Sequence, residues 1–180
     1  KLMAHPPSGA NWVHEVKFDG YRMQARIEGG RAKLFTRKGL DWTARFPEIA
    51  QDCDRLSDGI IDGEICALNA KGASDFGLLQ TALSDNKTGA LIYYLFDCLF
   101  ANGRDLRKDG LEARKAALQK LLKPLGKSRR ILFVPHFTSS GEAMLDAACR
   151  MDLEGVISKN LHAFYISGRG DSWTKSKCRG

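Results

Sequence analysis

Short stretches of alternating apolar and polar residues dominate the first part of the chain and predict β-strands. Residues 13–16 alternate in this way, and 21–28 and 31–37 form two further stretches separated by Gly29-Gly30. Two glycines between such stretches are typical of a two-residue hairpin turn. Asp19-Gly20 separates the first stretch from the second in the same manner, so we predict another hairpin there.

The rest of the chain mixes helical and strand patterns. Apolar residues recur at three- and four-residue steps in 41–56 and 111–123, which predicts helices, and 74–84 is expected to form a short one. Ser139-x-x-Glu142 has the spacing of a capping box that opens a helix reaching about residue 151. The remaining predicted strands are 59–68, 90–100, 131–137, 154–159 and 173–178. Since strands outnumber helices and hairpins join several of them, we predict an α+β fold with largely antiparallel sheets and helices packed outside.

Composition narrows the class of protein. The 180 residues, 43% of them hydrophobic, suffice for one large domain or two small ones. The 28 Lys and Arg residues exceed the 21 Asp and Glu residues, and the net charge of +7 favours a polyanionic partner such as a nucleic acid or a nucleotide. No apolar stretch has the length of a membrane helix, and no signal peptide opens the chain, so we expect no membrane association. Because the first residue is Lys1, we expect a fragment of a longer protein.

The cysteines argue against a structural zinc site. Five are present, namely Cys53, Cys66, Cys98, Cys149 and Cys178. They lie far apart, with no C-x-x-C pair and no cluster of histidines among them. This usage is typical of a reducing compartment, and Cys66 and Cys98, which lie in apolar runs, are expected in the core.

Several charged residues stand inside otherwise apolar stretches, where an unpaired charge is costly. These are Glu64, Asp97, Glu154 and Lys159, while Lys175 and Lys177 alternate with polar residues and would share one face of a strand. Each alone fits a charge at a strand end that reaches water. Together with Lys17, Arg22 and Arg37, they would form a cationic phosphate cradle with carboxylates for ribose hydroxyls and a divalent metal.

Lys17 is the candidate nucleophile of this cradle. A lone K-x-D-G fits a solvated surface lysine equally well. A free lysine titrates near about 10.4, so attack near neutral pH requires its pKa to fall by roughly 3, which corresponds to about 4 kcal/mol. Desolvation, neighbouring cations and a bound metal ion can supply this change.

Six short motifs occur in the chain in a fixed order. They are E-V-K-F-D-G-Y-R, T-R-K-G, D-G-E, Y-L-F-D, E-G-V-I-S-K and W-T-K-S-K. On these motifs, residues 11–178 resemble the nucleotidyltransferase (adenylation) domain of ATP-dependent DNA ligases, within the covalent nucleotidyltransferase superfamily. F-D-C-L-F-A-N-G-R-D-L-R, the following Leu-Glu-x-Arg-Lys helix and Y-I-S-G-R-G-D-S-W-T-K-S-K-C resemble the ligase module of bacterial ligase D, the non-homologous end-joining enzyme.

The resemblance implies a fold and a reaction. The fold would be ATP-grasp-like, with the nucleotide cleft between two sheets. Lys17 would attack the α-phosphate of ATP, form lysyl-AMP and expel pyrophosphate. The AMP would pass to a DNA 5′-phosphate at a nick, and attack by the 3′-OH would seal the strand.

The resemblance also assigns roles to the motif residues. Glu15 would read the adenine edge, largely through its backbone, and Phe96 would stack on the base. Arg22 and Glu64 would hold the ribose, and Arg37 would contact a phosphate of the nucleotide or of the DNA. Glu154, with Glu64, would place Mg²⁺ or Mn²⁺, and Lys175 and Lys177 would neutralise the α-phosphate. The other motif residues are Asp19, Gly20, Asp62, Gly63, Asp97 and Lys159.

The chain departs from the family pattern at three places. Lys38 replaces a frequent asparagine and would add a cation beside DNA phosphates. Ser158 and Ser176 replace apolar residues and suggest strands with a wetter outer face. The chain ends soon after Lys177, so we expect residues 1–180 to be the adenylation domain without the family's C-terminal OB-fold domain. Such a domain would bind ATP or carry AMP but seal nicks poorly.

The expected partners are nicked or broken double-stranded DNA, the other domains of a larger ligase and end-joining proteins, in the bacterial cytoplasm at the nucleoid. Three alternatives stay open: a capping-type guanylyltransferase that uses GTP, an RNA ligase and a non-catalytic DNA-binding module. An NAD-dependent ligase is disfavoured, because only 16 residues precede Lys17.

Overall fold

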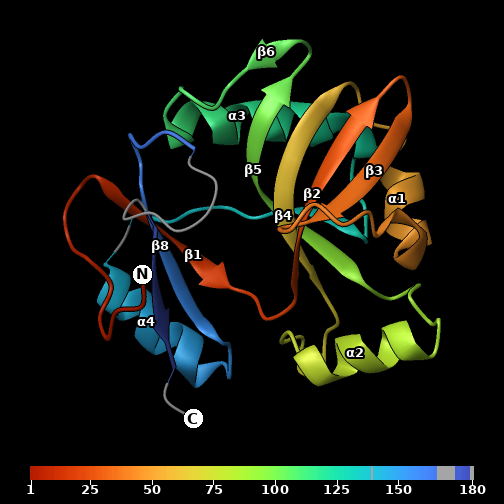
Figure 1. The fold of residues 1–180 in the computed structure, drawn as a ribbon. Helices are drawn as coiled ribbons and strands as arrows, with labels where there is room; N and C mark the ends of the chain where they lie inside the picture. The colour runs from red at the N-terminus through yellow and green to blue at the C-terminus, as the bar shows by residue number, and fades with distance from the viewer. Residues whose placement is uncertain (139, 166–172, 179–180) are drawn as a thin grey trace.

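The described part of the chain folds into two sheets with helices on their outer faces (Figure 1). The structure is a computed structural model, and it describes residues 1–138, 140–165 and 173–178. The three-stranded sheet has the antiparallel order β1 (Trp12–Lys17), β8 (Gly155–Asn160) and β9 (Trp173–Lys177). The six-stranded sheet has the order β3 (Arg31–Thr36), β2 (Tyr21–Glu28), β4 (Gly59–Cys66), β5 (Ile92–Ala101) and β6 (Arg104–Asp105), and β7 (Ile131–Phe133) pairs with β5. Only this last pairing is parallel among the described strands, which confirms the predicted α+β class.

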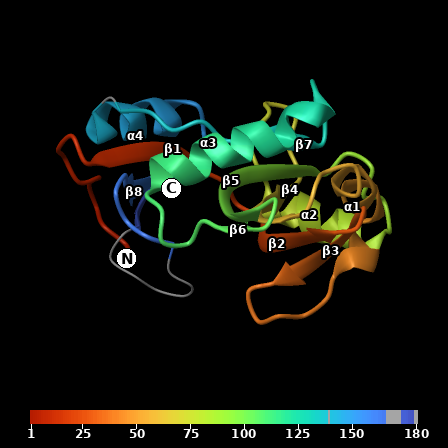
Figure 2. The ribbon, with the colours of Figure 1, turned by 90° about the horizontal axis from the view of Figure 1, so that it is seen from above.

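The helices divide between the two sheets. The α-helices are α1 (Pro47–Cys53), α2 (Phe76–Ser84), α3 (Leu111–Leu122) and α4 (Gly141–Arg150), and short 3-10 turns cover Thr43–Arg45 and Lys123–Leu125. In Figure 1, α4 lies beside the three-stranded sheet, and α1 and α2 lie on the side of the six-stranded sheet. Figure 2 shows α3 running above β5 from the side of the three-stranded sheet toward β7. None of the described helices is long and apolar enough to cross a membrane.

The hairpin at Gly29-Gly30 is confirmed. β2 and β3 pair antiparallel with Glu28 opposite Arg31, and both glycines have positive φ angles, of 58° and 79°. Residues Met23, Ala25 and Ile27 are buried, whereas Arg26 is exposed, so the period of two separates a core face from an open face.

The predicted hairpin at Asp19-Gly20 is wrong. β1 pairs with β8 in one sheet, while β2 pairs with β3 and β4 in the other, so this segment carries the chain from one sheet to the next. A Cβ atom at Gly20 would lie 2.1 Å from the carbonyl oxygen of Ile65. The glycine is therefore needed for a close backbone crossing rather than for a turn.

Three element predictions need adjustment. The helix predicted over 41–56 is interrupted at Phe46, whose φ of −128° and ψ of 61° are not helical, because the residue before Pro47 avoids the helical region. The strand predicted over 131–137 ends at Phe133. Ser139 lies outside the described residues, and the N-cap of α4 is Ser140, whose Oγ accepts a hydrogen bond from the Ala143 amide.

The expected wetter outer face of β8 and β9 is also wrong. Ser158 and Ser176 are fully buried, and Ser158 Oγ lies 2.8 Å from Nδ1 of the buried His14. Lys175 and Lys177 are exposed, which confirms that both share one face of β9. The serines thus belong to the interior, and the lysines supply the outer face.

The cysteines follow two patterns. Cys53, Cys66 and Cys98 are buried and unbonded, which confirms the core positions expected for the last two. Cys149 of α4 and Cys178, just after β9, form a disulfide, so the expectation of reducing-compartment usage does not hold for this pair. The two residues are 29 positions apart, a separation that carries no sequence signal.

We expect three thiols to react with a thiol reagent in unfolded, unreduced protein, and five after reduction, because one disulfide is present. Counting the thiols by absorbance under both conditions tests this. A count of five without reductant would contradict the Cys149–Cys178 bond.

We expect Gly20→Ala to destabilise the fold by about 3 kcal/mol or more, because its Cβ would collide with the Ile65 carbonyl oxygen. Urea unfolding measures the change. Gly89→Ala is the matched control, since the nearest atom to its Cβ would lie at 3.9 Å. Equal stability of the two variants would contradict the close crossing.

Candidate active site

Lys17 ends β1 at the seam between the two sheets. The antiparallel register places it opposite Gly155 of β8, one residue after Glu154. Its Nζ donates a hydrogen bond to Glu154 Oε1 at 3.2 Å, and the two side chains are 14% and 30% exposed. Gly155 itself packs closely against β9, since a Cβ there would lie 2.1 Å from the carbonyl oxygen of Ser176. The end of β1 thus places the Lys17 ammonium group beside a carboxylate.

Glu64 supplies a second carboxylate from β4 of the other sheet. It pairs across the strands with Arg22 of β2. Burial raises the pKa of Glu64 to about 7, although the charges of Arg22 and Lys17 act in the opposite direction. Burial also raises the pKa of Asp19, with a contribution from Glu154. Carboxylates that come from both sheets therefore interact electrostatically with the charges around Lys17.

Arg22 lies in a cage of one carboxylate and two rings. Its Nε and Nη2 donate to Asp62 Oδ1 at 3.0 Å and to Asp62 Oδ2 at 2.6 Å. The guanidinium carbon lies 5.0 Å from the centroid of the Phe96 ring and 4.8 Å from that of Trp173. Phe96 is 9% exposed and meets Trp173 edge to face. The residue predicted to hold ribose and the residue predicted to stack on the base are thus in contact.

Glu15 and Lys159 form a buried ion cluster with Lys115 of α3. Lys159 Nζ donates to Glu15 Oε1 at 2.8 Å, and Lys115 Nζ lies 2.7 Å from Glu15 Oε2. Lys115 also donates to the Val134 carbonyl at 2.7 Å, so its ammonium group lies between that carbonyl and the Glu15 carboxylate. Burial alone would raise the pKa of Glu15, but both lysines outweigh it and the pKa is lowered. Burial lowers the pKa of Lys159 to about 8, against the pull of Glu15.

The remaining cations of the predicted cradle line the open side. Arg37, just after β3, and Lys175 and Lys177 of β9 are exposed. The pKa of Lys175 is lowered by partial burial and then by the charges of Lys17 and Arg37. These charges are therefore close enough to repel one another, as expected of a site that awaits an anion.

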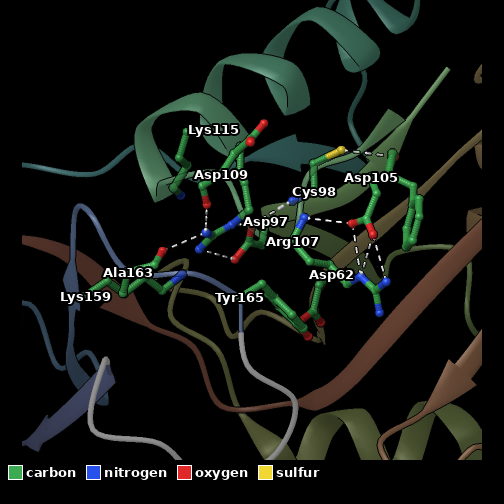
Figure 3. A network of polar contacts seen from close by, with 12 residues as sticks. Asp62, Asp97, Cys98, Asp105, Arg107, Asp109, Lys115, Lys159, Ala163 and Tyr165 are labelled. Atoms are coloured by element: carbon green, nitrogen blue, oxygen red, sulfur yellow. Dashed lines mark hydrogen bonds and ion pairs between the residues drawn. The ribbon is translucent and has the colours of Figure 1, made fainter. Parts of the chain in front are cut away.

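The other motif residues have structural positions. Asp97 is fully buried and accepts from Nε of the buried Arg114 at 2.8 Å (Figure 3). A Cβ at Gly63 would lie 2.2 Å from the carbonyl oxygen of Tyr94, so this glycine permits close strand packing. Lys38 is exposed next to Arg37, and the motif stretch that begins at Tyr165 lies outside the described residues over 166–172.

The sequence patterns assign no role in this network to four residues that belong to it, namely Arg114, Lys115, Tyr165 and Trp173. A signal existed for the first two, because they follow Leu111 by three and four residues and precede Leu118 by four and three. Both therefore lie on the apolar face of the helix, where a charge needs a buried partner. Tyr165 and Trp173 follow no such period.

A metal ion at this site would need the substrate as a ligand. The described residues contain no group of three His, Cys, Asp or Glu side chains that could hold one. Glu154 and Glu64 offer hard oxygen donors, and Mg²⁺ is commonly held by one or two carboxylates, waters and substrate phosphates. The two carboxylates therefore fit a Mg²⁺ ion that takes its other ligands from water and substrate phosphates.

Comparisons with known proteins give one consistent result. Residues 4–177 match the family model described as the ATP dependent DNA ligase domain. The chain is 39% identical over 181 residues to the multifunctional non-homologous end joining protein LigD of Pseudomonas aeruginosa, covering 99% of this chain and 21% of that protein. It is 27% identical over 172 residues to the SPbeta prophage-derived DNA ligase-like protein LigB of Bacillus subtilis, covering 94% and 62%.

Solved structures agree in fold. The ligase domain of M. tuberculosis LigD superposes with a TM-score of 0.79 at 26% identity, covering 98% of this chain and 59% of that one. A mycobacterial DNA ligase D complexed with ATP and MES gives a TM-score of 0.78 at 26% identity, with the same coverage. The chain thus spans about a fifth of the Pseudomonas protein and less than two thirds of these solved chains.

We expect Glu64→Gln to stabilise the protein at pH 8 by about 1–3 kcal/mol and to change little at pH 5. Because the folded-state pKa is raised to about 7, the folded protein retains a proton that the unfolded chain has released between about pH 4.5 and 7. Stability therefore falls as pH rises through this window, and glutamine removes the penalty.

Urea unfolding at both pH values measures this effect. Glu28→Gln, at an exposed carboxylate on the far end of β2, is the control and should show no difference between the two pH values. A Glu64→Gln effect that is equal at pH 5 and pH 8 would contradict the raised pKa.

Proposed function

The chain belongs to the family of ATP-dependent DNA ligase domains, and we propose that it is the adenylation domain of a longer DNA ligase with Lys17 as the nucleophile. The observation that supports this most directly is the place of Lys17. Its largely buried amine lies 3.2 Å from Glu154 at the seam between the sheets, with cations of both sheets nearby. The family match favours a DNA ligase over a capping enzyme or an RNA ligase.

The proposed first step is transfer of AMP to Lys17. The ammonium group donates to Glu154, so this contact must be released and a proton lost to solvent before Nζ can attack. Nζ then forms a bond to the α-phosphorus of ATP, and the bond from that phosphorus to the bridging oxygen breaks. Pyrophosphate leaves with the electron pair, and Lys175 and Lys177 neutralise charge on the α-phosphate. Such chemistry depends on positioning and on neutralisation of charge.

The nucleotide contacts are also proposals. Glu15 would read the adenine edge through its backbone, because its carboxylate is occupied by buried lysines. Phe96 would stack on the base, Arg22 and Glu64 would hold the ribose, and Arg37 would bind a phosphate. The contact between Arg22 and the Phe96 ring supports a common site for base and ribose.

A divalent ion would be held by Glu154 with help from Glu64. When bound, it supplies positive charge that neutralises the phosphates in the transition state. Mg²⁺ and Mn²⁺ both take oxygen ligands, so the proposed site would accept either ion.

The later steps and partners follow from the proposed place in a longer ligase. The AMP would pass from Lys17 to a DNA 5′-phosphate, and a 3′-OH would then displace it and seal the nick. Relatives such as the Pseudomonas aeruginosa LigD are multifunctional non-homologous end joining proteins, so we propose that other ligase domains and end-joining proteins act with this one on broken DNA. Residues 1–180 alone would seal nicks poorly, and bacterial cytoplasm at the nucleoid would be their place of action.

We expect incubation with ATP and Mg²⁺ to add one AMP to the protein, and pyrophosphate to remove it. Lys17→Ala abolishes the addition, because it removes the attacking amine. Intact-mass spectrometry measures both, and Lys120→Ala, on the exposed face of α3, is the matched control that keeps full labelling. Labelling by GTP in place of ATP, or labelling that survives in Lys17→Ala, would overturn the proposal.

A further inference from the structure

The Asp62 carboxylate accepts three hydrogen bonds. Arg22 donates to both of its oxygens. Tyr165, which lies beside Asp62 in Figure 3, donates from Oη to Oδ2 at 2.7 Å. Asp62 is 2% exposed, so its charge depends on these partners rather than on water. Removing one of them changes how the carboxylate is held.

The two partners of Asp62 come from different parts of the fold. Asp62 and Arg22 lie on the neighbouring strands β4 and β2 of the six-stranded sheet. Tyr165 is 103 residues further along the chain, in the segment that follows β8 of the three-stranded sheet. Through Asp62, the hydroxyl group thus connects the segment that follows the three-stranded sheet to an arginine of the six-stranded sheet.

The segment that carries Tyr165 is fixed by hydrogen bonds to the start of α3 and the loop before it. The Leu111 amide donates to the Leu161 carbonyl at 2.9 Å, and Arg114 Nη1 donates to the Ala163 carbonyl at 2.8 Å. The Tyr165 amide itself donates to the Arg107 carbonyl at 2.9 Å. The backbone therefore delivers the hydroxyl group to one place.

Tyr165 also lies beside two ion pairs. Asp62 and Asp97 are opposite each other on the paired strands β4 and β5, and like charges in such positions repel. Arg22 holds the first carboxylate and Arg114 the second. The Arg114 guanidinium lies 6.0 Å from the Tyr165 ring centroid, while the hydroxyl group contacts Asp62. Tyr165 is thus in contact with both arginine–carboxylate pairs.

We propose that Tyr165 is a positioning residue for nucleotide binding, whose hydroxyl group fixes Asp62 so that Arg22 is held beside Phe96 and Trp173 and presented to the ribose. The inference rests on the proposed function, because Arg22 is there assigned to the sugar. It adds a residue outside the six motifs, and it states that ribose recognition depends on contact between the two halves of the site.

The test measures equilibrium binding of ATP and of 2′-deoxy-ATP in the Lys17→Ala background, where AMP transfer cannot consume the nucleotide. We expect Tyr165→Phe to weaken ATP binding about 5-fold, the scale of one typical hydrogen bond. Binding of 2′-deoxy-ATP falls less, so the preference for the 2′-hydroxyl shrinks. Tyr21→Phe is the matched control, since that ring packs against Trp42 and Phe76, and it should change neither constant.

A double-mutant cycle with Asp62→Asn separates positioning from general destabilisation. If Tyr165 acts through Asp62, Tyr165→Phe adds little once Asp62 is altered. Equal weakening for both nucleotides, no weakening, or full additivity with Asp62→Asn would overturn the inference. Failure of the proposed function is distinguishable, since a protein that binds ATP but never forms lysyl-AMP with Lys17 present fails only in the mass measurement.

Discussion

Two neighbouring cations on the buried face of α3 hold the two sheets together. Arg114 pairs with Asp97 of β5, and Lys115 lies against Glu15 of β1. All four side chains are at most 4% exposed. Removing one partner of a buried pair costs about 3–5 kcal/mol, because the other charge is left without water or a counter-ion. Because Asp97 and Glu15 belong to different sheets, Arg114 and Lys115 can both be paired only when the two sheets keep one relative position.

That position determines where Lys17 points. Glu15 and Lys17 lie on the same face of β1, because successive side chains of a strand alternate. When Lys115 and Lys159 fix the Glu15 carboxylate, they also fix the face on which Lys17 emerges, two residues further along. The residue opposite Lys17 is Gly155, and the Lys17 ammonium group pairs with the neighbouring Glu154. The buried cluster and the candidate nucleophile are thus parts of one strand geometry.

Features that depend on residues close together in the sequence could be predicted from it. The Gly29-Gly30 hairpin and the shared face of Lys175 and Lys177 follow from turn chemistry and the period of two. The identity of the candidate site followed from the motifs. The Asp19-Gly20 prediction failed because a glycine also serves a close crossing, and only the distance to the Ile65 carbonyl distinguishes the two uses.

The features that the sequence did not predict depend on contacts between segments that are far apart in the chain. Cys149 bonds to Cys178, and Tyr165 reaches Asp62 across 103 positions. Nothing in a single sequence reports such pairs. Buried Ser158 belongs to the same class, since its hydroxyl group is satisfied by the ring of His14, 144 positions away.

The candidate site holds charges that are unfavourable in the free protein, although buried ion pairs join the two sheets firmly. Lys175 carries a lowered pKa, from partial burial and from the repulsion of Lys17 and Arg37, while burial raises the pKa of Glu64. The shift of Lys175 records a cost of burying its charge and of holding it near other cations, and the shift of Glu64 records the cost of burying its carboxylate. A triphosphate with its metal ion would offset the cationic part of this cost, so nucleotide binding and stability are linked. The ion pairs of α3 make the arrangement possible, because they hold the sheets in place while the seam between them carries mutually repelling charges.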